Sequence, residues 1–237
     1  MDRSCPRSVR LRGGGHPDDH RLLAAQYSRR NDGGADPAWR WLSQLGIQPR
    51  GPSGGQLLER RWSRTLRPHA ADWHITPDRI GILGFSAGGH LAATASTRFD
   101  RGNPQASDPV ERPGNRPDFA ILGYPVISMT ESWTHQGSKT NLLGDQPSAE
   151  LARSLSADLA VTARTPPTFL FLTNADTVVP AENSVSYYLA LRKAGVPAEM
   201  HIFENGPHGV GLAQDDAALS EWPKLLLAWL RGRGLGH

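Results

Sequence analysis

Short apolar segments alternate with helical patterns along the last two thirds of this chain, and this alternation limits the possible fold more than any other feature. Apolar runs bounded by Gly, Pro or charged residues are typical of strands buried on both faces. When a helix follows each strand, we expect a mainly parallel sheet with helices on both faces. The predicted strands are 79–85, 119–124, 168–173 and 198–203, and the predicted helices are 87–98, 180–194 and 217–231.

The composition is that of one globular domain. A chain of 237 residues is long enough for a sizeable core, although its apolar fraction of 38% is below the average. Cys5 is the only cysteine, so the chain can form neither an internal disulfide nor a zinc site built on thiolates. We find no signal-peptide core and no apolar run long enough to cross a bilayer, and we therefore expect no membrane partner and a cytoplasmic location for the chain as written.

Charge divides the chain near residue 68. Residues 1–68 contain 13 Arg, no Lys and 6 acidic residues, whereas residues 69–237 carry a net charge of −4. A basic start is compatible with a nucleic-acid-binding arm, but its tryptophans do not interleave with the arginines, so we predict no nucleic-acid partner. We predict an atypical Arg/Gly/Pro-rich region at 1–68, part of it disordered, and the α/β core at 69–237.

A G-x-S-x-G sequence links the predicted strand 79–85 to the helix that follows. The five letters alone are weak evidence, but a buried strand, a sharp turn and a helix are the setting that a nucleophile elbow requires. We expect Ser86 to adopt a strained backbone that Gly84 and Gly88 permit because neither has a Cβ. The N–H of Ala87 would then point to where an oxyanion forms. The alternative is a serine in an ordinary turn.

Two later residues supply the base and the acid that a serine nucleophile needs. Asp176 stands just beyond the predicted strand 168–173, and His208 stands on a Gly/Pro loop after the last strand. The chain order of Ser86, Asp176 and His208 is the order found with such elbows. Taken singly, Asp176 is also explained as a turn or capping residue, and His208 as a loop histidine.

Other polar residues are weaker candidates. His90 lies on the helix after Ser86, which points it away from the hydroxyl, so we expect it to be packed. For Trp133 and His135 we expect an exposed loop pair, with pocket lining as the alternative. His201 lies inside a predicted strand, and we expect it to be structural. Glu182 is a weaker alternative to Asp176 because it lies on a predicted helix, and Asp145 and Asp158 lie in a polar insertion without strand ends.

Several stretches resemble the α/β-hydrolase esterases related to hormone-sensitive lipase and acetylxylan esterase. They lie between about residues 69 and 235 and read DRIGILGFSAGGHLA, GYPVIS, PPTFLFLTNADTVVP, NSVSYYLALRKAGVPAEMHIFENGPHGVGL and WPKLLLAWLRGRG. The resemblance implies an α/β-hydrolase fold and hydrolysis of carboxylic esters through an acyl-enzyme, without metal or organic cofactor, often on acetylated sugars. It places Ser86, Asp176 and His208 on the family's nucleophile, acid and base.

The N-terminal third departs from this family. The resemblance implies a strand ending in a glycine loop that supplies a second oxyanion N–H, and here only residues 13–15 correspond, which makes Gly14 the candidate donor and a flexible turn the alternative. Where the family places an apolar strand, residues 48–68 contain no four consecutive apolar residues. We therefore expect N-terminal strands to be degraded or missing, and we hypothesise that part of residues 1–68 is out of register with the ancestral gene.

The sequence is compatible with three functions. The leading one is an esterase that cleaves small carboxylic esters, chiefly acetyl and carbohydrate-linked ones, with the N–H groups of Ala87 and Gly14 holding the oxyanion. The second is a noncatalytic or unstable relic of the fold, which the unusual N-terminus favours. The third is a peptidase of the prolyl oligopeptidase type, which shares the residue order but usually carries a large additional domain for which this chain has no room. Nothing in the sequence indicates an oligomeric state.

Overall fold

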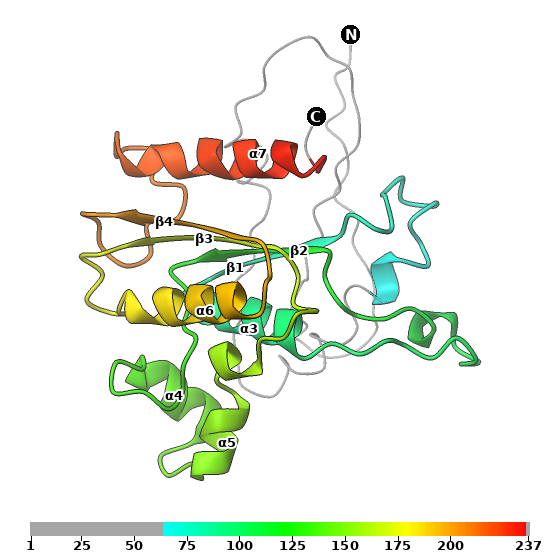
Figure 1. Cartoon of the computed structure of the whole chain (residues 1–237), viewed down its shortest axis with the longest axis horizontal. Coiled ribbons are helices and arrows are strands. Elements are labelled where there is room, and N and C mark those ends of the chain that lie inside the picture. The colour runs from blue at the N-terminus through cyan, green and yellow to red at the C-terminus, as the bar shows by residue number, and fades with distance from the viewer. Residues whose placement is uncertain (1–63, 236–237) are drawn as a thin grey trace, which may run out of the picture.

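A parallel sheet of four strands forms the centre of residues 64–235, the part of the chain that the computed structural model describes (Figure 1). The strands lie in the order β1 (Gly81–Phe85), β2 (Phe119–Gly123), β3 (Thr168–Thr173) and β4 (Ala198–Phe203). Every neighbouring pair is parallel, so the carboxyl ends of all these strands meet at one edge of the sheet. The four predicted strands are thus confirmed, with bounds that differ by at most two residues.

Helices cover both faces of this sheet, as the sequence predicts (Figure 1). On one face, α7 (Trp222–Gly232) buries Trp222, Leu226 and Trp229 in one apolar cluster with the aromatic residues of β3. On the other face, α3 (Ser86–Thr97) and α6 (Glu182–Lys193) pack in a second cluster. The sheet is therefore the middle layer between two cores.

The strand β3 shows why this sequence forms a central strand. All six residues of TFLFLT are buried, which is the pattern of a parallel strand covered on both faces. Side chains alternate between the faces, so Phe169 and Phe171 join the α7 cluster and Leu170 joins the α3/α6 cluster. Trp222 is fully buried and stacks on Phe171 with ring centroids 3.9 Å apart.

The predicted helix at 217–231 forms as two pieces, which corrects its expected start. A 3₁₀ helix, η3 (Leu219–Glu221), precedes α7. The Asp216 carboxylate accepts hydrogen bonds from the N–H groups of Ala218 and Leu219, both at 2.9 Å, and so fixes the tight first turn. Pro223 has no N–H to donate, and it occupies the first turn of α7, where none is needed.

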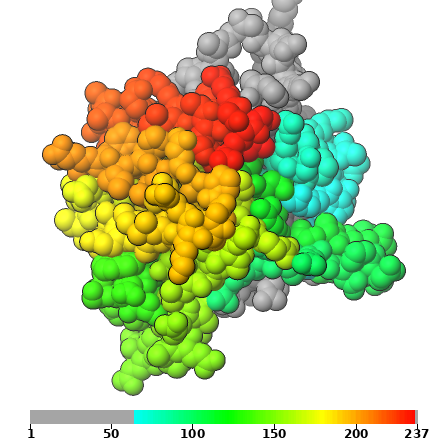
Figure 2. Space-filling view, viewed as in Figure 1, coloured from blue at the N-terminus to red at the C-terminus, as the bar shows by residue number. Residues whose placement is uncertain are grey.

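The segment between β2 and β3 forms a lobe of short helices that projects from the sheet layers (Figure 2). It contains α4 (Gln136–Leu143), α5 (Ala149–Ser154) and a 3₁₀ helix, η2 (Ala157–Ala160). Another 3₁₀ helix, η1 (Pro109–Glu111), lies between α3 and β2.

The predictions for the N-terminal region, including the degraded or missing strands and the role of Gly14, lie outside the described residues. The boundary between residues 68 and 69 likewise stays a prediction. Within residues 64–235, β1 forms one edge of the sheet and β4 the other. No helix in this part of the chain has the length and apolar character needed to span a membrane.

Candidate active site

The turn between β1 and α3 holds Ser86 in a left-handed backbone conformation. Its φ is +54°, which is rare for a residue with a Cβ and costs of order 1–3 kcal/mol. The serine is the first residue of α3 and directly follows the last residue of β1. Its carbonyl accepts a hydrogen bond from Val126 N–H at 3.0 Å, just beyond β2. The strained turn predicted from the sequence is confirmed, and it lies at the carboxyl edge of the sheet.

The glycines around Ser86 differ in what they contribute. A Cβ on Gly84 would lie 2.1 Å from the carbonyl oxygen of Gly88, so glycine is required at position 84. A Cβ on Gly88 would meet nothing within 4 Å, so the steric role predicted for Gly88 is wrong. The Gly88 carbonyl, rather than its missing side chain, makes the close approach. The second required glycine is Gly89, where a Cβ would lie 2.6 Å from the Cβ of Pro125.

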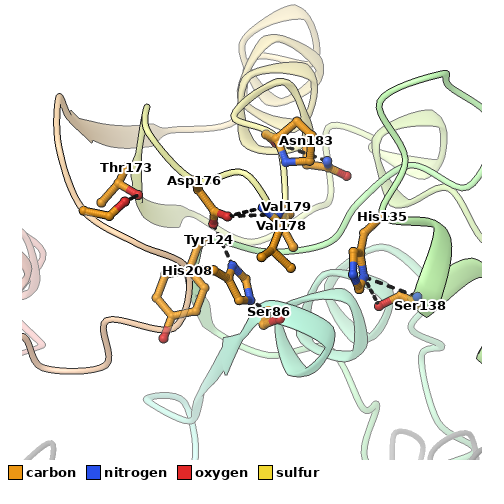
Figure 3. Close-up of polar contacts among 12 residues, drawn as sticks. Ser86, Tyr124, His135, Ser138, Thr173, Asp176, Val178, Val179, Asn183 and His208 are labelled. Carbon is orange, nitrogen blue, oxygen red and sulfur yellow. Dashed lines mark hydrogen bonds and ion pairs between the residues drawn. The ribbon is translucent and has the colours of Figure 1, made fainter.

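The structure brings Ser86, His208 and Asp176 into one line of contacts (Figure 3). Ser86 Oγ lies 2.7 Å from His208 Nε2, and His208 Nδ1 lies 2.6 Å from Asp176 Oδ2. These residues come from three different strand ends, and 122 positions separate the serine from the histidine. Parallel strands place such residues together because their carboxyl ends share an edge.

The hydrogen bonds show which atoms of Asp176 and His208 donate and which accept. The Asp176 side chain is 1% exposed, and its Oδ1 accepts from the N–H groups of Val178 and Val179 at 2.8 and 3.0 Å. A carboxylate only accepts, so His208 donates Nδ1–H to Oδ2 and presents the lone pair of Nε2 to the Ser86 hydroxyl. Asp176 thus forms a turn and also pairs with the histidine. The two roles that the sequence offered for this residue, a turn residue and the acid, are compatible.

The loop that carries His208 is held at two glycines. The carbonyl of Gly206 accepts from Thr173 Oγ1 at 2.9 Å, where β3 ends. Gly211 N–H donates to the Tyr124 hydroxyl at 3.1 Å, and the Gly211 carbonyl accepts from Trp222 Nε1 at 3.0 Å. The path of this loop is therefore set by contacts to the ends of β2 and β3 and to α7.

Tyr124 is a site residue that the sequence analysis did not identify. Its ring lies edge-on to the His208 ring, with centroids 5.1 Å apart. Burial raises the pKa of the Tyr124 phenol and the charge of Asp176 raises it further, so the hydroxyl stays neutral and accepts from Gly211. Tyr124 directly follows β2, next to the strand ends that carry Ser86 and Asp176. This position at the end of a predicted strand could have identified it as a site residue.

The candidate oxyanion donor Ala87 lies in the first turn of α3. The first four N–H groups of an α-helix have no acceptor inside the helix and carry its positive end. The N–H of Ala87 is one of them, next to the nucleophile candidate. Its role as a donor stays a prediction, as does that of Gly14.

The weaker candidates lie apart from this line of contacts. His90 is buried and donates Nε2–H to the Leu155 carbonyl at 2.8 Å, as expected of a packed residue. His201 pairs with Glu199 on β4. Trp133 and His135 are half-buried, which corrects the expected exposed pair. His135 Nδ1 accepts from Ser138 N–H and caps α4. The other three are Asp145 and Asp158, in or beside the projecting lobe, and Glu182, the exposed first residue of α6. Among residues 64–235 no group of three or more His, Cys, Asp or Glu side chains is arranged to hold a metal ion.

A parallel sheet with helices on both faces, a strained serine between strand and helix, and an aspartate and a histidine at the same edge define an α/β-hydrolase. The chain belongs to the BD-FAE family, whose model matches residues 61–191, more than half of its length.

Two curated relatives each match about two thirds or more of this chain. An acetylxylan esterase of Xylanibacter ruminicola is 36% identical over 72% of this chain and 36% of its own length. Endo-1,4-beta-xylanase B of Butyrivibrio fibrisolvens is 37% identical over 65% of this chain and 24% of its own length. The chain thus spans about a third or less of these curated relatives. The crystal structure of an acetyl ester-xyloside bifunctional hydrolase from Caldicellulosiruptor lactoaceticus matches with a TM-score of 0.76 and 46% identity, covering 81% of this chain and 70% of that one.

Proposed function

We propose that this chain is a serine esterase that hydrolyses small carboxylic esters, chiefly acetyl esters of carbohydrates, through an acyl-enzyme. The observation that carries the proposal is the unbroken line of contacts from Asp176 through His208 to the Ser86 hydroxyl. Relatives named as an acetylxylan esterase and an acetyl ester-xyloside hydrolase support the substrate class.

In the first half of the proposed reaction, Ser86 Oγ attacks the ester carbonyl carbon while its proton moves to His208 Nε2. The carbonyl oxygen becomes an oxyanion, which the N–H of Ala87 and the positive end of α3 stabilise. Asp176 keeps His208 in the required tautomer and offsets the positive charge of the imidazolium. When the carbon–oxygen bond to the alcohol breaks, Nε2 returns the proton to the leaving oxygen and the acyl group stays on Ser86.

In the second half, water replaces the alcohol. His208 Nε2 takes a proton from the water, whose oxygen attacks the acyl carbon, and the bond to Ser86 Oγ then breaks with return of the proton to the serine. The products are a carboxylic acid and the free enzyme. Each proton transfer uses the same nitrogen, which lies 2.7 Å from the serine oxygen.

Labelling with a fluorophosphonate and hydrolysis of 4-nitrophenyl acetate test this proposal. We expect the probe to label Ser86 and the Ser86→Ala variant to lose both labelling and nearly all esterase activity. Loss of labelling without loss of activity would move the site elsewhere. A folded protein that neither reacts with the probe nor hydrolyses the ester would instead support a noncatalytic relic.

The peptidase alternative receives no support from the names of these relatives. The proposed partner is a small-molecule ester, and the absence of nucleic-acid and membrane partners, like the cytoplasmic location, stays a prediction from the sequence.

A further inference from the structure

Asn183 is a fully buried amide in the first turn of α6, beside the turn that follows β3 (Figure 3). Its Oδ1 accepts from the N–H groups of Ile127 and Ser128 at 2.9 and 3.3 Å, and its Nδ2 donates to the Pro180 carbonyl at 3.1 Å. A longer contact of 3.4 Å joins Nδ2 to the Trp133 carbonyl. Backbone groups therefore occupy both N–H donors and both lone pairs of this amide.

On one side, the Asn183 amide holds the loop that supports the turn of the nucleophile. Val126 N–H donates to the Ser86 carbonyl at 3.0 Å. The next residue, Ile127, donates its N–H to Asn183 Oδ1. The two donors are consecutive in the chain and the peptide unit between them is rigid, so a shift of the loop at Ile127 also moves the group that meets Ser86.

On the other side, the amide holds the end of the turn that carries the acid. The N–H groups of Val178 and Val179 donate to Asp176 Oδ1 at 2.8 and 3.0 Å. Pro180 follows directly, and its carbonyl accepts from both the backbone N–H and the Nδ2 of Asn183. The backbone bond attaches this turn to α6, whereas the side chain attaches both of them to the loop after β2.

These contacts close a path around the three candidate catalytic residues. From the Ser86 carbonyl the path runs through the loop after β2, Asn183 and the turn after β3 to Asp176, and it returns through His208 to the Ser86 hydroxyl. Asn183 is the side chain that joins the nucleophile half of this path to the acid half. A misplacement of about 1 Å between reacting groups costs on the order of 10²-fold in rate.

We propose that Asn183 is a positioning residue that fixes Asp176 and His208 relative to Ser86. The inference rests on the proposed function. The side chain of Asn183 bonds only to backbone groups outside these three residues, so it acts through them and not on the ester itself. Without the amide, two N–H groups of the loop after β2 lose the acceptor that they use, and the loop is no longer held to α6.

Kinetics of Asn183→Ala test the inference, with Ser156→Ala as the matched control. The Ser156 hydroxyl is also fully buried and accepts from the same loop, from Met129 N–H at 2.9 Å. It donates to the Ala152 carbonyl of α5 at 3.0 Å, so it joins the loop to the projecting lobe and not to the acid turn. We expect kcat for 4-nitrophenyl acetate, per fluorophosphonate-labelled site, to fall about 10–100-fold in Asn183→Ala with little change in KM. Ser156→Ala should keep both values near those of the wild type.

A spectroscopic readout follows the hydrogen bond between Asp176 and His208 directly. Because this bond is short, at 2.6 Å, the proton on His208 Nδ1 should resonate at low field in nuclear magnetic resonance spectra of the wild-type protein. We expect the signal to move to higher field in Asn183→Ala, where the acid turn is less firmly held, and to stay in place in Ser156→Ala. A change in global stability alone would not move it.

Asn183→Ser is a second variant in case alanine impairs folding. Its hydroxyl can still donate to the Pro180 carbonyl, but it is one atom too short to reach Ile127, so it should lower kcat and move the His208 signal in the same way. A wild-type kcat and an unmoved signal in the folded variants would overturn this inference alone.

Two further outcomes would also count against a positioning role. An equal loss of kcat in Asn183→Ala and Ser156→Ala, or a failure of both Asn183 variants to fold while Ser156→Ala folds, would make the role of Asn183 purely structural. No activity on any ester and no fluorophosphonate labelling of the wild-type protein would overturn the proposed function and this inference with it.

Discussion

The left-handed backbone of Ser86 depends on the close approach of Gly84 to Gly88. A Cβ at position 84 would lie 2.1 Å from a backbone oxygen, and the turn cannot relax without moving β1 or α3. We therefore predict that Gly84→Ala lowers the free energy of unfolding by about 1–3 kcal/mol, measured by urea denaturation. Gly88→Ala is the control, because its Cβ meets open space and alanine favours a helix by up to about 1 kcal/mol. Equal losses in both variants would contradict this account.

The tautomer of His208 depends on the charge of Asp176. If asparagine replaced Asp176 and turned its amide nitrogen toward His208, it would donate a hydrogen bond to Nδ1 instead of accepting one. Nε2 would then carry the proton and could not act as a base. We expect Asp176→Asn to lower kcat for 4-nitrophenyl acetate about 10⁴-fold. The fold should persist, because Oδ1 can still accept from Val178 and Val179. Steady-state kinetics and circular dichroism check both points, and a kcat near the wild-type value would remove Asp176 from the mechanism.

The sequence could place Ser86, Asp176 and His208 at one edge because each follows a recognisable strand. The parallel sheet brings the three strand ends to the same edge, and hydrogen bonds of the loop after β4 set the position of His208. Tyr124 was harder to identify, since its hydroxyl meets the backbone of Gly211, 87 residues further along the chain. The need for glycine at position 89 depends on the position of Pro125, which no local pattern predicts.

At the scale of elements, the end of β2 and the start of α7 hold the loop after β4 from both sides of Gly211. Tyr124→Phe removes one of these contacts while keeping the ring beside His208. We predict a loss of about 0.5–1.5 kcal/mol in the free energy of unfolding and faster hydrogen exchange at the Gly211 amide. Nuclear magnetic resonance of the free enzyme measures the exchange rate. An unchanged rate would show that Trp222 and Thr173 suffice to fix the loop.

Burial explains why the ends of some helices and strands could be predicted from the sequence. The strand β3 matches its predicted bounds because all six residues are buried and a polar turn follows at once. Only the start of the helix predicted at 217–231 was wrong. The Asp216 carboxylate accepts from two backbone N–H groups there, and a short 3₁₀ helix precedes α7. Apolar periodicity reports the face that a helix buries, whereas its first turn is set by individual hydrogen bonds.

At the largest scale, within residues 64–235, two apolar clusters enclose the sheet, and a third joins the loop after β2 to the projecting lobe. His90 adds a polar link, since it lies on α3 and donates to the carbonyl of Leu155, which follows α5. Burial of this side chain between the sheet layers and the lobe favours its neutral form. The stability of the whole fold is therefore coupled to the protonation of one side chain.

Burial lowers the pKa of His90 below its ordinary value of 6.5, and the charge of Arg98 adds to this effect, while the hydrogen bond to Leu155 opposes it. Below about pH 6.5 the unfolded chain binds a proton at this residue that the folded chain does not, so stability falls as the pH falls. We predict that the free energy of unfolding decreases by up to about 1.4 kcal/mol per pH unit from this group between pH 6.5 and the pKa of the folded state. His90→Gln can still donate to Leu155 but does not titrate, so urea denaturation of this variant should give a shallower acid slope. Parallel slopes in the two proteins would assign the acid sensitivity to other groups.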